Sequence, residues 1–95
     1  MIYIEGAISV WLVASPEHHR RLKIIAQILT SSAQDNGATK TEITYAASLS
    51  HAKAEDYLST LIDSGLLEYD DKIQLYRATD KGMRFLTDYK KKLDE

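Results

Sequence analysis

The sequence contains no cysteine, a single proline and four glycines among its 95 residues. The absence of cysteine excludes disulfide bonds and cysteine-based zinc sites, and it is typical of proteins in a reducing compartment. A chain of this length forms one domain that buries roughly 60–65% of its unfolded surface. We therefore expect a single small fold held together by one modest apolar core.

Positive charge is also scarce. Twelve lysine and arginine residues stand against fourteen aspartate and glutamate residues, which gives a formal net charge of −2 at pH 7. Most DNA-binding domains carry an obvious basic footprint, so this balance argues against DNA binding by a general electrostatic field. A DNA-binding protein of this composition has to place its few cations locally.

The residue spacings that mark an enzyme or a metal protein are missing. There is no glycine-rich phosphate loop and no serine in a nucleophile elbow, and the carboxylates are scattered. His18 and His19 diverge by about 100° on a helix, whereas zinc prefers three or four convergent ligands. The basic stretch that they begin, which ends at Lys23, spans most of a helix's circumference and is interpreted as a solvated face. We expect no enzymatic activity, no cofactor and no metal site.

The first fifteen residues, MIYIEGAISVWLVAS, form an apolar stretch. They lack a cationic start, contain Glu5 and are shorter than the roughly 20 apolar residues of a membrane span. The sequence therefore predicts a soluble cytoplasmic protein, associated with the nucleoid if it binds DNA.

Two structures fit residues 1–14. The alternating apolar residues fit a β-strand or hairpin, whereas Ile4, Ile8, Trp11 and Leu12 also have the spacing of a helical stripe. The content of β-branched residues favours the strand. Trp11 needs to be covered in either case. The segment is then a self-association arm or a strand that closes the domain's own small sheet, and both alternatives are open.

The first helix is predicted from residue 16 to about residue 33. Ser15 supplies a capping hydroxyl, Pro16 suits the first helical position, and Glu17 lies near the positive end of the helix dipole. Asp35-Asn36-Gly37 ends the helix. The buried stripe is expected to consist of Leu22, Ile25, Ala26 and Leu29.

A short second helix follows. Thr39 and Glu42 have the spacing of a capping box, in which the hydroxyl and the carboxylate each accept a hydrogen bond from a backbone amide. This helix is predicted to run through Ala47, with Ile43 and Tyr45 facing inward. It leads into a tight turn and a further helix.

The third helix is predicted to run from a Ser50 cap to Asp63 or Ser64, with Gly65 as its stop. At 100° per residue, its core face consists of Ala54, Leu58, Leu61 and Ile62. The opposite face carries small, hydroxyl and charged side chains, which suit close approach to base edges. In a helix-turn-helix the N-terminal part of this helix meets the bases. The candidates for base contact are Ser50, His51, Ala52, Lys53 and Tyr57. The alternative is a solvated helix face.

A hairpin and a last helix complete the order. Alternation predicts strands at Leu66–Tyr69 and Ile73–Arg77 around a turn at Asp70-Asp71. Thr79 caps a helix that reaches about Leu93. Its apolar side consists of Phe85, Leu86, Tyr89 and Leu93. This order is the winged helix-turn-helix plan, a mainly helical α+β fold. Residues 16–95 are assigned to the winged-helix domain and residues 1–15 to an apolar arm or strand.

The remaining candidates are contacts to phosphate. Thr39, Lys40 and Thr41 lie at a helix N-terminus, where free amides and the helix dipole favour an anion. Alternatively, this segment is only a cap. The tip of the wing is acidic, but Lys72 and Arg77 can reach phosphate from the strands, unless they are ordinary sheet-edge cations.

The chain contains the phrases GATKTEITYAASLS and ATDKGMRFL, together with Ala52, Tyr57-Leu58 and Gly65-Leu66-Leu67. In this combination, over about residues 20–90, it resembles the small archaeal winged-helix proteins that bind DNA, which include chromatin-associated proteins and predicted transcriptional regulators. The resemblance implies a winged helix, a dimer formed through a C-terminal helix, and DNA contact that is sequence-tolerant or operator-directed.

The chain departs from that family at the third helix. His51 stands where relatives usually carry an aromatic residue, Glu55-Asp56 stand where they carry basic residues, and the last helix is shorter than theirs. We expect a homodimeric transcriptional regulator that binds double-stranded DNA through the third helix, with protomers joined by the N-terminal arm, the C-terminal helix or both. The alternative, favoured by the net charge and the acidic pair, is a winged-helix protein-interaction module without DNA binding.

Overall fold

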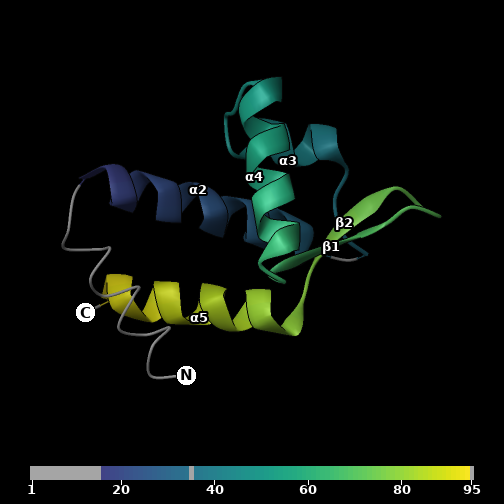
Figure 1. Cartoon of the computed structure of the whole chain (residues 1–95). Coiled ribbons are helices and arrows are strands. Elements are labelled where there is room, and N and C mark those ends of the chain that lie inside the picture. Colours follow the sequence, from purple (N-terminus) through teal and green to yellow (C-terminus); the bar gives the residue numbers. More distant parts are fainter. Residues whose placement is uncertain (1–15, 35, 95) are drawn as a thin grey trace.

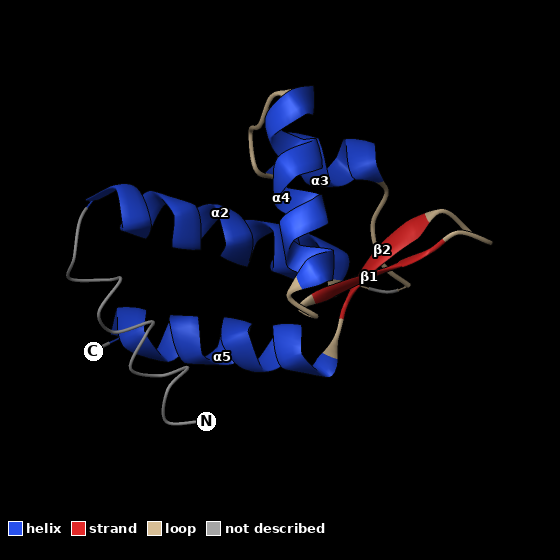
Figure 2. Cartoon of the chain, in the orientation of Figure 1, coloured by secondary structure: helices blue, strands red, loops and turns tan. Residues whose placement is uncertain are grey.

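The computed structural model describes residues 16–34 and 36–94, so the predicted arm at residues 1–15 lies outside the described residues. The described chain contains four helices and one hairpin in the predicted order (Figures 1 and 2). The elements are α2 (Pro16–Ser32), α3 (Lys40–Ala46), α4 (His51–Asp63), β1 (Leu67–Asp70), β2 (Leu75–Ala78) and α5 (Asp80–Asp94). The α+β winged helix-turn-helix arrangement is confirmed.

Helix α2 is the centre of the arrangement. It contacts α3, α5 and β2, while α4 packs against β1 and α3. Figure 1 shows α2 and α5 side by side with opposite chain directions, and α4 crossing over α2. The hairpin projects from the end of this assembly as the wing. Within the described residues, no helix combines the length and the apolar character needed to cross a membrane.

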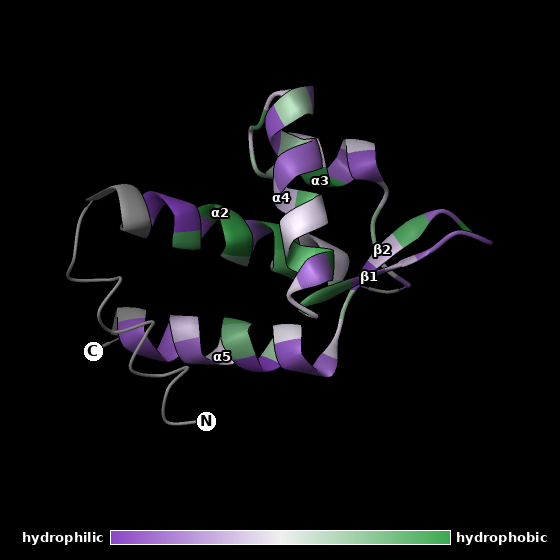
Figure 3. Cartoon of the chain, viewed as in Figure 1, coloured by the Kyte–Doolittle hydropathy of each residue, from purple (hydrophilic) through white to green (hydrophobic). Residues whose placement is uncertain are grey.

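The core forms where these elements meet, and Figure 3 shows apolar segments of α2 and of the hairpin base near α4. Leu22, Ala26 and Leu29 of α2 are buried as predicted, and Ile25 is half-buried. Ile28 was not predicted, yet it is fully buried. Since α2 touches α3 and α5, its buried stripe is wider than that of a helix with one neighbour. Other elements contribute Ile43, Ala54, Leu58, Leu61, Leu67, Leu86 and Tyr89.

The predicted caps at Thr39 and Ser50 are present, whereas the predicted Ser15 cap lies outside the described residues. The Thr39 hydroxyl accepts from the Glu42 amide at 3.1 Å, and the Glu42 carboxylate accepts from the Thr39 amide at 2.9 Å. The Ser50 hydroxyl accepts from the Lys53 amide at 3.2 Å at the start of α4. Each cap satisfies an amide that the helix itself leaves unpaired.

The prediction that Tyr45 and Ile62 face the core is wrong. Tyr45 is 88% exposed and Ile62 is 39% exposed. Helix α3 has only seven residues, and Ile43 alone provides its fully buried side chain. On α4, Leu61 takes the core position beside the hairpin and leaves the adjacent Ile62 directed outward.

The wing differs from the predicted turn. Asp70 pairs with Leu75, so four residues, 71–74, form the loop and Ile73 lies in it, half-exposed. A two-residue turn at Asp70-Asp71 is therefore wrong. The Asp70 carboxylate accepts from the Lys72 amide at 3.0 Å, a local turn that aspartate side chains favour over a continued strand.

Candidate nucleic-acid interface

The exposed start of α4 contains the residues predicted to contact bases. Ser50, His51, Ala52 and Lys53 are all exposed, whereas Ala54 on the opposite face is fully buried. The buried residues of α4 therefore fix its orientation and leave its first turn accessible. Ala52 offers little steric hindrance to a close approach.

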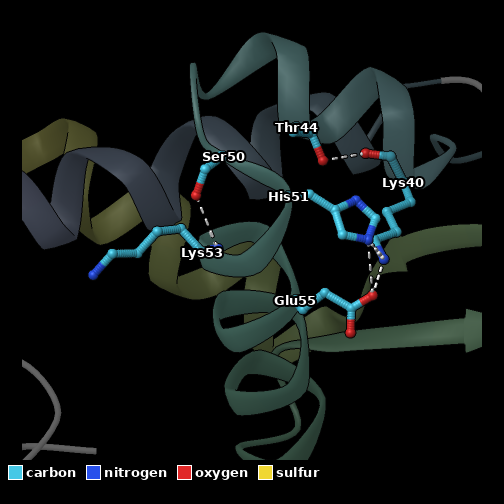
Figure 4. A network of polar contacts seen from close by, with 6 residues as sticks. All are labelled: Lys40, Thr44, Ser50, His51, Lys53 and Glu55. Atoms are coloured by element: carbon cyan, nitrogen blue, oxygen red, sulfur yellow. Dashed lines mark hydrogen bonds and ion pairs between the residues drawn. The ribbon is translucent and has the colours of Figure 1, made fainter.

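Two cations flank this exposed strip. At 100° per residue, Lys53 and Tyr57 lie on one side of α4, and His51 and Glu55 lie on the other. Lys40, the first residue of α3, joins the second side. Figure 4 shows Lys53 extending away from α4 on the side opposite Lys40, His51 and Glu55.

Lys40, His51 and Glu55 form one polar cluster between α3 and α4. The Lys40 ammonium donates to the Glu55 carboxylate and lies 3.2 Å from His51 Nε2. His51 Nε2 is 3.6 Å from the same carboxylate oxygen, Glu55 Oε2. The Lys40 carbonyl accepts from the Thr44 hydroxyl at 2.7 Å, which fixes the backbone beside the cluster. The predicted phosphate contact at Lys40 thus already has an anionic partner.

Lys53 lies beside a groove between α4 and α2. The groove has a volume of about 430 Å³ and is lined by Arg21, Lys53, Asp56 and Tyr57 together with apolar side chains. Tyr57 is half-buried against the core, so much of its ring serves packing. Arg21 was interpreted from the sequence as part of a solvated face, and the structure places it on the Lys53 side of α4. Arg21 and Lys53 are 32 positions apart in the sequence, so sequence patterns could not predict that they line the same groove.

The predicted anion site at Thr39, Lys40 and Thr41 is largely occupied by the chain itself. The capping box uses the amides of Thr39 and Glu42 and places the Glu42 carboxylate at the start of α3. The exposed Thr41 and the half-buried Lys40 side chain remain as possible phosphate contacts. That role stays a prediction.

The two predicted cations of the wing, Arg77 and Lys72, differ in how available they are to phosphate. Arg77 Nε is 3.5 Å from Glu68 Oε2, and Arg77 Nη2 is 3.5 Å from Asp70 Oδ2. Lys72 lies exposed in the loop. Since Arg77 is shared between two carboxylates, Lys72 is the more available of the two predicted contacts.

Two tyrosines have a perturbed pKa, Tyr76 of the wing strand β2 and Tyr89 of α5 in the core. The pKa of Tyr76 is raised, first because burial disfavours the charged phenolate and then through the neighbouring Tyr69. Burial also raises the pKa of Tyr89. The described residues contain no group of three or more potential metal ligands.

Residues 19–95 match the model of the winged helix-turn-helix family. The chain belongs to this family. No curated protein matches the sequence of this winged helix. Membership indicates DNA binding and a fold that is typically not enzymatic, and it agrees with the exposed first turn of α4.

Proposed function

We propose that this winged helix binds duplex DNA through the start of α4, acts as a homodimer and regulates transcription. The observation that carries the proposal is the position of Lys40 and Lys53 on opposite sides of the exposed strip of α4. At 100° per residue, Ala52, the hydroxyl-bearing Ser59 and the acidic Asp56 lie between them. These short side chains between two cations suit a helix that lies in a groove.

The dimensions of DNA support this placement. The major groove is about 12 Å wide and admits one α-helix, and a phosphate backbone runs along each side of it. A helix seated there brings Lys53 toward one strand and the Lys40–Glu55 pair toward the other. His51 and Lys53, in the first turn, are then directed to base edges or to the adjacent phosphates.

The proposal of a homodimer follows from the small number of cations. Phosphate contacts supply most of the affinity of DNA-binding proteins, and each protomer offers few of them. Two protomers on adjacent half-sites double the number of contacts. The protomers are proposed to join through the N-terminal arm, the C-terminal helix α5 or both, and the 40% exposed Met83 of α5 is available for such a contact.

Fluorescence anisotropy on a mixed-sequence duplex tests the DNA-binding function. Affinity is expected to fall steeply between about 50 and 200 mM salt. Lys53→Ala should weaken binding about fivefold and make the salt slope shallower by about 0.9. Lys91→Ala, which removes one exposed cation from α5, is the matched control and should have a much smaller effect. Absence of binding at 50 mM salt, or equal effects of both variants, would reject the proposal.

The rival function is a protein-interaction module without DNA binding. The pairing of Lys40 with Glu55, and of Arg77 with Glu68 and Asp70, favours it. These ion pairs reduce the positive charge available to a duplex. The same titration decides between the two functions, because the rival predicts no salt-dependent affinity for DNA.

A further inference from the structure

We propose that Glu55 determines specificity by suppressing sequence-independent DNA binding, because its carboxylate holds Lys40 away from phosphate. This inference rests on the proposed DNA-binding function. It assigns a role to an acidic residue that otherwise counts only against DNA contact.

The positive charge of Lys40 is already matched within the protein. Its ammonium donates to the Glu55 carboxylate, and these two opposite charges cancel. The Lys40–Glu55 pair therefore presents no net positive charge to a phosphate.

Lys40 is also the least exposed side chain of its cluster. The Lys40 side chain is 29% exposed, whereas those of Glu55 and His51 are 57% and 79% exposed. An approaching backbone phosphate thus meets the carboxylate and the imidazole more readily than the ammonium. To contact phosphate, Lys40 has to leave Glu55 or the phosphate has to approach a like charge. Both routes weaken the contact that every DNA sequence offers.

The neighbouring acid, Asp56, lies in a different environment. Asp56 follows Glu55 on α4, is also exposed, and makes no ion pair among the described residues. It lies beside the groove that contains Lys53, away from Lys40. Asp56→Asn and Glu55→Gln therefore remove the same charge from adjacent positions, but only the second frees Lys40.

The test measures anisotropy with a mixed-sequence duplex over a salt series. Glu55→Gln should bind about fivefold to tenfold more tightly than the wild type, with a salt slope steeper by about 0.9, since one more phosphate is contacted. This gain should disappear when Lys40 is replaced as well, in Lys40→Met/Glu55→Gln compared with Lys40→Met. Any gain in Asp56→Asn should persist in the Lys40→Met background.

The outcomes separate the two proposals. If the wild type binds DNA and Glu55→Gln binds no more tightly, the role of Glu55 is wrong while DNA binding stands. A gain that persists without Lys40 also rejects it, because the effect is then a general loss of negative charge. If none of the variants binds at 50 mM salt, the DNA-binding function fails and this inference fails with it. Thermal unfolding of each variant verifies that these exposed substitutions leave the fold intact.

Discussion

The backbone of Gly82, in the first turn of α5, lies directly against the carbonyl group of Leu66, just before β1. A Cβ atom at position 82 would overlap the Leu66 carbonyl oxygen and would lie 3.2 Å from Leu29 Cδ2. The same carbonyl accepts from the Thr79 amide at 3.1 Å. This contact joins the last helix to the base of the wing and to the core of α2.

Gly82→Ala is predicted to destabilise the protein in spite of its helical position. Intrinsic propensity alone would make alanine about 1 kcal/mol more stable than glycine inside a helix. Backbone overlap should reverse the sign and cost about 1–3 kcal/mol, the usual range for overpacking. Urea unfolding measures the change, and a gain in stability would show that α5 can move away from Leu66 freely.

Thr79 is predicted to stabilise the junction between α4 and α5 through its hydroxyl. The hydroxyl donates to the Gly65 carbonyl at 2.6 Å and accepts from the Gly82 amide at 3.0 Å. Thr79→Ala should cost about 1–2 kcal/mol, as for other N-cap threonines. Thr79→Ser keeps the hydroxyl and is the control. Equal losses in the two variants would assign the effect to the missing methyl group.

The sequence predicts local features of this fold well because their causes are local. The capping box of Thr39 and Glu42 depends on residues three positions apart, and Gly65 takes a φ of +81° at the helix stop where glycine was expected. Burial was harder to predict, since Ile28 and Ile62 have the same side chain and differ only in which elements cover them.

In the candidate site, too, local features are predictable from the sequence and contacts between elements are not. Its exposed first turn follows from the α4 pattern, but the partner of Lys40 does not. Glu55 is fifteen positions away, and only the crossing of α3 and α4 brings the two charges together. From the sequence, Lys40 was therefore interpreted as an available cation and Glu55 as a separate acid. In the structure the two charges form one ion pair.

The stability of the protein is predicted to fall at alkaline pH partly through Tyr76 and Tyr89. The folded state raises the pKa of both phenols. Phenols in the unfolded chain lose their proton near pH 10, while the folded state still holds it. Stability contributed by the neutral rings is complete below that pH and is lost as the pH rises through the folded pKa.

Urea unfolding between pH 8 and pH 11 checks this prediction at the pH where free tyrosine titrates, about 10. Tyr89→Phe and Tyr76→Phe should each make the alkaline decline shallower. Tyr45→Phe is the matched control, since Tyr45 is 88% exposed and should leave the slope unchanged. An equal effect of all three substitutions would exclude burial as the cause.

Removal of residues 1–14 is predicted to separate the protomers if the arm holds them together. Sedimentation velocity should give about twice the chain mass of 10.8 kDa for the full chain and a single chain mass for one that starts at Ser15. Circular dichroism of the shortened chain tests the competing interpretation, in which the segment closes the domain's own sheet and its removal unfolds the domain. If both chains sediment as dimers, the arm is not the dimerisation device. Met83→Lys then tests α5, because a buried lysine at an apolar contact should dissociate the pair.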